Sequence, residues 1–454
     1  MKEIARHIFA HALRESSVGA AFARQVSCER GVLRICDDLY DLNSYGRVFV
    51  ISLGKAAHTM LTALHEQTGE RFEGIVASPI APEFHVRGFR YFQGGHPLPN
   101  ADSIHAAEAM LKSLNTLNDS CLAIFLISGG GSACAEKPVD DEISLDDLIA
   151  TYRALVNCGA PIGEINAIRK HLSAIKGGRL AQAAYPAQQV SILISDVPDS
   201  TPDALASGPT MPDSTTVEDC YRIAGKHKLL PPFENRKRAS PERPKGVEGW
   251  GTPDTGGFPR SVAELFERHA LEETPKSDDP AFIRARWWTV LSNSVMLRAA
   301  KDEAERQGFT VEIDNSCDDW DYARAADYLL TRLRELRKSN ERVCLLSGGE
   351  VTVHVENGGV GGRNQQFALY CAEEIAGETI CVLSAGSDGI DGNSPAAGAI
   401  VDGMTHVRAI AGGLLPQQHL DAFDCYPLLN ALGDAVVTGP TGNNLRDIRI
   451  LLSY

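Results

Sequence analysis

Short, nearly continuous runs of Val, Ile and Leu recur along the chain, and helical patterning separates one run from the next. The runs lie at 48–53, 122–127, 190–194, 343–346 and 380–383. Strands that are buried on both faces of a parallel sheet have this continuous apolar character, whereas half-exposed strands alternate. The pattern predicts an α/β protein with a doubly wound, mainly parallel sheet in the N-terminal part and a smaller α/β unit in the C-terminal part.

The composition changes between 231 and 280, where Pro, Gly and charged residues are dense and apolar periodicity is absent. Such a stretch is typical of a linker or a mobile surface insertion. The chain of 454 residues is also long for a single core. We predict an N-terminal Rossmann-like α/β domain over 1–235, a linker or mobile insertion over 236–284 and a C-terminal α/β domain over 285–454.

Each apolar run leads into serine and glycine. The endings read SLGKA (52–56), SGGGSA (128–133), SDVPD (195–199), SGGEV (347–351) and SAGSDG (384–389). Ligands of open α/β sheets bind at the carboxyl ends of the strands. Glycine has no Cβ, so a ligand can approach the backbone N–H groups of such turns. The endings therefore predict a phosphate site.

Two cations stand at the start of predicted helices, where the helix dipole disfavours them. In 51–67 a strand ends, Gly54 turns the chain and a helix begins near Lys55; in 358–377 glycines precede a helix that begins at Arg363. A cation there costs about 0.3–1 kcal/mol unless an anion accompanies it. Two such cations in different halves predict a cleft for phosphate or carboxylate, although both side chains could instead extend into solvent.

A polar stripe supports the same cleft. Apolar residues form one face of a helix predicted over 164–179. The adjoining sector holds Asn166, Arg169, Lys170, Ser173 and Lys176. This sector is either a solvated surface or a face that contacts an anion.

Carboxylates follow two further strand ends. Asp196 lies in SDVPD, and Asp388 and Asp391 lie in SAGSDGIDG (384–392). They could hold Mg²⁺ beside phosphates or accept a proton from a substrate hydroxyl. The alternative is ordinary Asx-turn chemistry, which Asp next to Pro, Ser or Gly commonly provides.

The net charge and the cysteine content indicate which classes of partner and which location to expect. The net charge is −15, which disfavours nucleic acid and anionic membranes. Eleven dispersed cysteines without a C-x-x-C pair indicate reduced thiols and a cytoplasmic location. No apolar run approaches the ~20 residues of a membrane span. The arginines of the amphipathic N-terminus allow a second, weaker interpretation, a mitochondrial presequence. The oligomeric state is not determined by the sequence, and a homodimer is one possibility.

Ordered motifs over most of the chain resemble the glycerate 2-kinase family with a C-terminal MOFRL domain, some members of which carry the older label hydroxypyruvate reductase. The motifs are SLGKAA (52–57), GGHPLPNADS (94–103), LISGGGSA (126–133), INAIRKHLSAIKGGRLA (165–181), ISDVPD (194–199), ASGPT (206–210), LLSGGEVTV (345–353), GGRNQ (361–365), AGSDGIDG (385–392), AAGA (396–399) and TGPTGNN (438–444). The resemblance implies that ATP and Mg²⁺ are used to phosphorylate D-glycerate at its 2-hydroxyl, in an active site within the interdomain cleft.

The resemblance also implies site residues. Lys55 and Arg363 match the family's proposed catalytic lysine and arginine, and Asp196 joins them as proton acceptor or metal ligand. The implied nucleotide- and phosphate-binding residues are Gly54, Ser128, Gly129, Gly130, Gly131, Ser132, Lys170, Gly348, Gly349 and Asn364. Asn166, Arg169 and Asp388 are expected to bind substrate, and Asp196 and Asp388 to bind the metal.

The chain departs from the family pattern in places. ASPIAPEF (77–84) replaces a common Lys-Tyr-Gly-His segment, Asp199-Ser200 replaces Gly-Asp, and Cys-Ala-Glu follows LISGGGSA. A related hydroxy acid is therefore an alternative acceptor. Two other functions stay open: an NAD(P)H-dependent reductase of hydroxypyruvate or tartronate semialdehyde, and a non-catalytic nucleotide-binding protein. Neither a GxxxxGK[ST] nor a complete G-x-G-x-x-G motif occurs, which argues against a Walker-type site and against the reductase.

Overall fold

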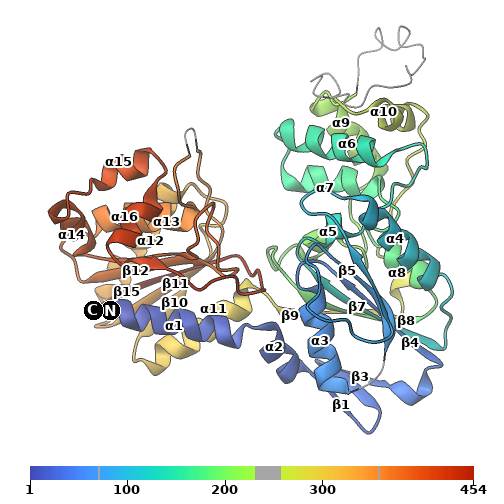
Figure 1. Cartoon of the computed structure of the whole chain (residues 1–454), viewed down its shortest axis with the longest axis horizontal. Coiled ribbons are helices and arrows are strands. Elements are labelled where there is room, and N and C mark those ends of the chain that lie inside the picture. The colour runs from blue at the N-terminus through green and yellow to red at the C-terminus, as the bar shows by residue number, and fades with distance from the viewer. Residues whose placement is uncertain (70–71, 231–256, 356–357) are drawn as a thin grey trace.

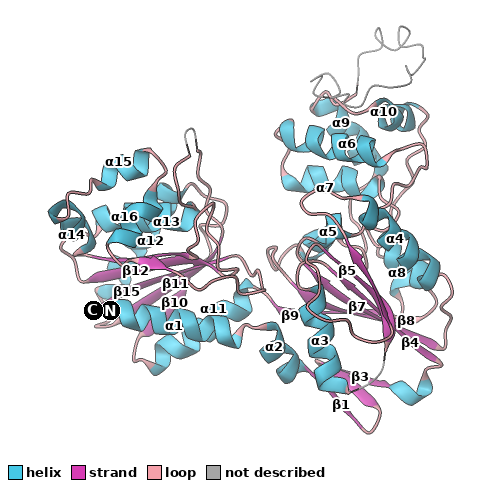
Figure 2. Ribbon diagram, in the orientation of Figure 1, coloured by secondary structure: helices cyan, strands magenta, loops and turns pink. Residues whose placement is uncertain are grey.

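The computed structural model describes residues 1–69, 72–230, 257–355 and 358–454, which form two lobes (Figure 1). Each lobe is built around a six-stranded sheet with helices on both faces (Figure 2). The predicted α/β class is therefore confirmed. In these ranges no helix has both the length and the apolar character needed to cross a bilayer.

The N-terminal lobe contains the parallel sheet that the apolar runs predicted. All five neighbouring strand pairs in the order β6-β5-β4-β7-β8-β9 are parallel. All eight residues of β7 are buried, which explains its unbroken apolar run. The strands are β4 (Arg47–Leu53), β5 (Glu73–Ser78), β6 (Phe89–Gln93), β7 (Cys121–Ser128), β8 (Gln188–Ile194) and β9 (Ala285–Leu291).

Helices cover both faces of this sheet. One face packs against α2 (Val18–Gln25) and α3 (Ala57–Thr68), and the other against α4 (Ala101–Leu114), α5 (Gly131–Cys134) and α8 (Arg179–Ala184). A small antiparallel sheet lies beside α2 and α3. It consists of β1 (Val26–Glu29), β2 (Val32–Ile35) and β3 (Asp38–Asp41), with the 3₁₀ turn η1 (Leu42–Ser44) after it.

A separate helical cluster extends the lobe beyond α5 (Figure 1). It contains α6 (Leu145–Asn157), α7 (Ile162–His171), α9 (Val217–Lys226) and α10 (Arg260–Glu267). The 3₁₀ segment η2 (Pro202–Ser207) contacts α7, and the 3₁₀ segment η4 (Pro280–Phe282) contacts α8 and β9 instead. Val262 and Phe266 of α10 are buried in this cluster. The prediction of a linker over 236–284 is thus wrong from 257 onward, because α10 has its own apolar face. Residues 231–256 lie outside the described residues.

The C-terminal lobe has a mixed sheet in the order β10-β11-β15-β12-β13-β14. Of the neighbouring strand pairs in this sheet, only β10–β11 is parallel. β15 enters between β11 and β12 in the opposite direction, and β13 is antiparallel to both β12 and β14. The strands are β10 (Thr310–Ile313), β11 (Val343–Gly349), β12 (Ile380–Gly386), β13 (Gly398–Asp402), β14 (Ala435–Val436) and β15 (Asp447–Ser453). One face carries α12 (Tyr322–Arg337), α13 (Arg363–Glu374), α14 (Thr405–Ala411), α15 (Pro416–Asp421) and α16 (Cys425–Ala431).

Two segments lie in a different lobe from the one that the predicted domain boundaries gave them. The first helix, α1 (Lys2–Glu15), packs with α11 (Asn293–Arg306) against the second face of the C-terminal sheet. The strand β9 pairs with β8 in the N-terminal sheet. Both corrections have one cause: an apolar helix face or strand does not reveal in sequence which sheet will bury it. The chain consequently crosses between the lobes before α2 and again after β9.

Candidate active site

A pocket of about 710 Å³ lies between the two lobes. Lys55, Ser128 and Gly129 line it from the N-terminal lobe. Asp388 and Asn444 are among the residues that close it from the C-terminal lobe. The pocket thus joins the carboxyl end of the parallel sheet to loops of the second lobe, at the place where sheets of this kind bind ligands.

A tight turn places Lys55 in this pocket. Gly54 has φ +114°, and a Cβ there would lie 2.5 Å from the carbonyl oxygen of Ser128. The N–H of Lys55 donates to the carbonyl oxygen of Gly129 at 2.9 Å, and the N–H of Ala56 donates to Oγ of Ser128 at 3.0 Å. Two strand-end loops are therefore bonded together. Lys55 precedes α3 by two residues, and its exposed side chain has no hydrogen-bond or ion-pair partner among the described residues.

The glycine turn after β7, of which Gly129 lines the pocket, carries several backbone N–H groups that could bind an anion. Gly130 has φ +79° and caps α5. Among the described residues, the N–H groups of Gly129, Gly130, Gly131 and Ser132 have no protein acceptor. Successive free N–H groups around a left-handed residue form an anion-binding concavity. A turn of this kind is suited to an anion, and its binding of phosphate stays a prediction.

Asp196 and His96 lie against the same turn. A Cβ on Gly129 would be 1.9 Å from Oδ2 of Asp196. A Cβ on Gly130 would be 3.0 Å from both Cδ2 of His96 and Cγ of Lys55. The absence of side chains at these glycines therefore brings a lysine, a carboxylate and an imidazole together. Sequence reasoning missed His96, although its motif GGHPLPN gave a usable signal.

The environment raises the pKa of Asp196 and lowers the pKa of His96. Burial raises the pKa of Asp196, while the positive charges of Lys55 and Arg446 act against that rise. Partial burial and the charge of Lys55 lower the pKa of His96 below 6.5. At neutral pH the imidazole is therefore mostly uncharged and can accept a proton.

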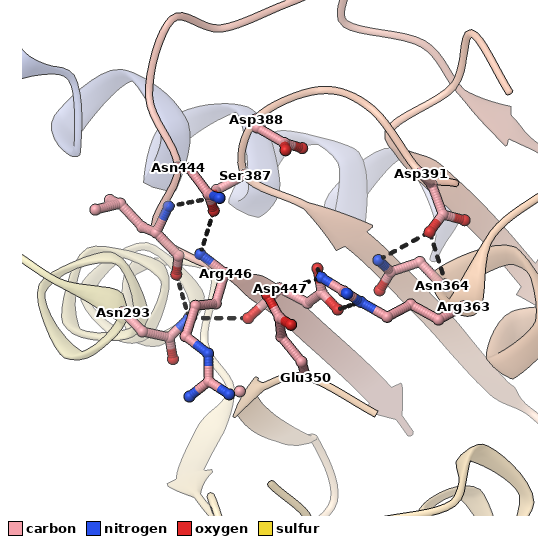
Figure 3. Close-up of polar contacts among 12 residues, drawn as sticks. Asn293, Glu350, Arg363, Asn364, Ser387, Asp388, Asp391, Asn444, Arg446 and Asp447 are labelled. Carbon is pink, nitrogen blue, oxygen red and sulfur yellow. Dashed lines mark hydrogen bonds and ion pairs between the residues drawn. The ribbon is translucent and has the colours of Figure 1, made fainter. Parts of the chain in front are cut away.

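Arg363 forms a second centre at the start of α13 (Figure 3). Its guanidinium makes two bonds to Asp447, Nε to Oδ2 at 2.6 Å and Nη2 to Oδ1 at 3.1 Å, and Nη2 lies 2.9 Å from Oε1 of Glu350. Bonds to Asp447 and the two carboxylate charges outweigh burial and raise the pKa of Arg363. Arg363 is not among the residues that line the pocket around Lys55.

Arg446 lies between the two centres. Its guanidinium forms a two-bond fork with Asp318, at 2.7 Å and 2.6 Å. Its charge acts both on Glu350, a partner of Arg363, and on Asp196 of the other lobe. The side-chain N–H₂ of Asn293 donates to the carbonyl oxygens on both sides of Arg446 and fixes this strand end. None of these roles was predicted from the sequence.

The predicted ligand role of three C-terminal residues is corrected. A Cβ on Gly348 would meet Asn293, and one on Gly349 would meet Asp318. The N–H of Gly348 donates to Asn315, and the carbonyl oxygens of both glycines accept bonds from the buried Arg449. These glycines therefore serve side-chain packing rather than phosphate contact.

Asn364 is also closed off from ligands. It is buried, its Oδ1 accepts a bond from Ser384 at 2.6 Å, and its backbone N–H donates to Asp391. The other carboxylate oxygen of Asp391 accepts the N–H of Gln365. From the sequence, we expected a ligand to supply the anion at the start of α13. In the structure the carboxylate of Asp391 supplies that anion. Burial raises the pKa of Asp391 to about 6.

The predicted polar stripe of α7 does not line the Lys55 pocket. Lys170 is buried, and its Nζ pairs with Asp203 at 2.9 Å and Asp213 at 3.2 Å. Its prediction as a phosphate ligand is therefore wrong. The guanidinium of Arg169 lies over the ring of Tyr152, 4.6 Å from the ring centroid. Neither Asn166 nor Arg169 lines the pocket, and their substrate contacts stay predictions.

The two predicted metal ligands lie on opposite sides of the pocket region. Within the described ranges, no group of three or more His, Cys, Asp or Glu side chains is arranged to hold a metal. Oδ1 of Asp388 accepts the N–H of Ile390 at 3.1 Å in an Asx turn. The carboxylate of Asp196 bonds only to its own backbone N–H among the described residues. Mg²⁺ beside phosphates commonly needs only one or two carboxylates, so Asp196 fits that ion.

Two family models match the chain. Residues 4–239 match a domain of unknown function, DUF4147, and residues 343–447 match the MOFRL family. The matched ranges include Lys55, His96 and the Gly129 turn in the first and Arg363, Arg446 and Asp447 in the second.

Curated relatives cover most of the chain. The D-glycerate 2-kinase of Thermotoga maritima is 34% identical over 89% of this chain and 90% of its own length. The glycerate 2-kinase of Pyrococcus horikoshii is 34% identical over 90% of this chain and 87% of its own length. A relative from Agrobacterium vitis, 34% identical over 90% of this chain and 87% of its own, carries a hydroxypyruvate reductase name.

Solved structures share the fold over the whole chain. The crystal structure of glycerate kinase from Thermotoga maritima has a TM-score of 0.83 and 32% identity, covering 100% of this chain and 99% of that one. A crystal structure of a Pyrococcus horikoshii protein has a TM-score of 0.82 and 31% identity, covering 100% and 98%. The two-lobed arrangement is therefore shared with these proteins.

Proposed function

Since the chain belongs to the glycerate 2-kinase family with a C-terminal MOFRL domain, we propose that it transfers the γ-phosphoryl group of ATP to the 2-hydroxyl of D-glycerate. The products are 2-phosphoglycerate and ADP. The observation that carries the proposal is the pocket that Lys55 and Gly129 line, at a turn whose four successive N–H groups have no protein acceptor among the described residues. Phosphoryl transfer needs positioning and charge neutralisation more than covalent help, and both are available there.

Each group at the Gly129–Gly130 turn has a role in this reaction. The N–H groups of the turn hold phosphate oxygens of ATP, and Lys55 neutralises charge on the phosphoryl group during transfer. His96, with its lowered pKa, accepts the proton of the 2-hydroxyl. The hydroxyl oxygen then bonds to the γ-phosphorus while the bond from phosphorus to the bridging oxygen breaks, and ADP leaves.

Asp196 is the residue that we propose to hold Mg²⁺. Its carboxylate is directed at Gly129 and is free of other side chains in the described part of the chain. Bound Mg²⁺ would neutralise phosphate charge and orient the phosphates. Asp388 faces the pocket from the other lobe and can bind substrate or a metal-bound water.

Arg363 is the proposed partner of Lys55 from the C-terminal lobe. Its side chain keeps 34% of its surface exposed although two carboxylates hold it. A planar guanidinium suits either phosphate or the carboxylate of D-glycerate. Because Arg363 does not line the Lys55 pocket, this role requires the lobes to close.

Identification of the product tests the proposal. The chain incubated with ATP, Mg²⁺ and D-glycerate should yield 2-phosphoglycerate by ³¹P and ¹³C NMR, together with ADP. Consumption of NAD(P)H with hydroxypyruvate, without ADP release, would instead support the reductase name of the Agrobacterium relative. All eleven cysteines are free, which supports the proposal that the enzyme acts in the reducing cytoplasm.

A further inference from the structure

The Lys55 pocket has a second, apolar end. Beyond Lys55 and Gly129 it is lined by Ile80, Phe84 and Val86 from the loop between β5 and β6, and by Ile390 from the C-terminal lobe. Large apolar side chains usually avoid water, yet Ile80 is 57%, Phe84 59% and Ile390 49% exposed. The three side chains therefore leave apolar surface open inside one pocket, on both of its walls.

The loop that bears Ile80 and Phe84 is held in place by several contacts. Nε2 of His58 bonds to the carbonyl oxygen of Ile80 at 2.8 Å, and the N–H of Val86 donates to the hydroxyl of Tyr91 at 2.8 Å. The ring of Tyr91 stacks on His58, with 5.6 Å between centroids, and packs on His85 at 4.4 Å. These bonds fix both ends of the loop to α3 and β6, so its apolar side chains form a defined surface.

The two ends of the pocket match a ligand of mixed character. One end offers a cation and unpaired N–H groups, which suit phosphate, and the other offers apolar side chains from both lobes. D-Glycerate has three carbons and is polar throughout, so it gains nothing from the apolar end. A nucleotide has phosphates at one end and a flat, largely apolar base at the other.

We propose that Ile80 and Phe84, with Ile390 opposite them, form the binding site for the nucleobase of the phosphoryl donor. The inference rests on the proposed function and assigns one part of the donor to one part of the pocket. It also gives a role to ASPIAPEF (77–84), one of the segments in which this chain departs from the family pattern. Contacts from both lobes further mean that binding of the base draws the lobes together.

Binding of ADP in the absence of acceptor tests this assignment. In the double variant Ile80→Ala/Phe84→Ala, the Kd for ADP measured by calorimetry should rise about 10-fold or more, because the base loses its apolar contacts. The KM for ATP should rise with it, and the KM for D-glycerate should stay unchanged. Inhibition by inorganic tripolyphosphate, which lacks a base, should also stay unchanged. Ile283→Ala is the control, because Ile283 is 72% exposed and lies outside the pocket.

The outcomes separate this inference from the proposed function. If the wild-type protein phosphorylates D-glycerate but the double variant binds ADP normally, the base site is wrong and the kinase stands. A raised KM for D-glycerate alone would assign the apolar end to the acceptor and overturn the inference. Weaker ADP binding by the double variant, with no phosphorylation of D-glycerate by the wild type, would support the base site and reject the acceptor. Failure of the wild type to bind ADP would overturn the base site.

Discussion

The guanidinium of Arg363 forms a two-bond fork with the carboxylate of Asp447, at 2.6 Å and 3.1 Å. The side chain of Asp447 is 1% exposed, whereas that of Arg363 is 34% exposed. The buried carboxylate thus fixes the plane of the guanidinium and leaves part of it open. The carboxylate thereby stabilises a cation that would otherwise be misplaced at the start of a helix.

Arg363→Lys should lower kcat by about 10- to 100-fold, because an ammonium group cannot reproduce the fork or its orientation. It should also lower the free energy of unfolding by about 1–3 kcal/mol, since a buried carboxylate loses a bond. Steady-state kinetics and urea denaturation measure the two effects. Arg332→Lys is a matched control, because Arg332 makes the same fork with Glu312 at a more exposed site. A kcat within twofold of the wild type would remove Arg363 from the mechanism.

Lys55→Ala should lower kcat by about 10²-fold or more, if Lys55 stabilises the transferring phosphoryl group. Its unfolding free energy should match the wild type, because the side chain is exposed and forms no ion pair in the described structure. Kinetics with saturating ATP and a thermal melt provide the readouts. Lys112→Ala, at another exposed lysine, should change neither. Loss of stability equal to the loss of activity would argue for a structural role.

Much of the architecture could be predicted because local pattern determines it. The continuous apolar runs identified β4, β7, β8, β11 and β12, which are buried on both faces. The pattern did not show which sheet each element packs against, so the sequence placed α1 and β9 in the wrong lobes. An apolar face specifies that it must be buried, not which of two sheets buries it.

The site was predictable in the same partial way. Lys55 and Gly129, which line the interlobe pocket, could be selected from the sequence because a glycine turn after a buried strand has a direct physical reason. Gly348 looks identical in sequence, but Asn293, more than fifty positions away, fills the space beside it. His96 and Arg446 were missed because their importance lies in tertiary neighbours, on which a linear pattern carries no information.

His96 should determine the acidic limb of the rate profile. Its folded pKa lies below 6.5, so kcat/KM should be constant near neutral pH and fall as the ring becomes protonated. His96→Gln should remove this limb and lower the plateau by about 10²-fold, as expected for loss of a general base. A limb that persists in the variant would belong to another group.

The same histidine predicts the sign of a stability change. Because the pKa of His96 is lower in the folded chain than in the unfolded chain, the unfolded chain binds more protons below pH 6.5. The stability that neutral His96 contributes is therefore present above pH 6.5 and is lost as pH falls through the folded pKa. On acidification the melting temperature of the wild type should therefore fall more than that of His96→Gln. A pH-independent difference would mean that the folded pKa is unshifted.

Lobe closure should accompany substrate binding. Lys55 lines the interlobe pocket and Arg363 does not, so a reaction that uses both must bring the C-terminal lobe closer. The chain crosses between lobes at only two places in the described structure, before α2 and after β9, which permits such a hinge. Small-angle scattering should give a smaller radius of gyration with ADP, Mg²⁺ and D-glycerate than without them. An unchanged radius would leave Arg363 outside the reaction.

Gly129→Ala should lower the activity of the enzyme by displacing Asp196. The new Cβ would lie 1.9 Å from Oδ2 of that carboxylate, far inside van der Waals contact. The φ angle of Gly129 is not positive, so the backbone tolerates alanine and the damage should stay local. We expect kcat to fall by about 10²-fold, with a weaker Mg²⁺ dependence of the residual rate.

Gly225→Ala provides the control for this substitution. A Cβ on Gly225, within α9, meets nothing within 4 Å, and alanine favours a helix over glycine by up to about 1 kcal/mol. Activity should therefore be unchanged and the melting temperature raised. Because the two variants add the same methyl group, opposite results would trace the loss in Gly129→Ala to the surroundings of Gly129, and a weaker Mg²⁺ dependence would assign it to Asp196. Wild-type kcat in Gly129→Ala would show that the position of Asp196 does not matter to catalysis.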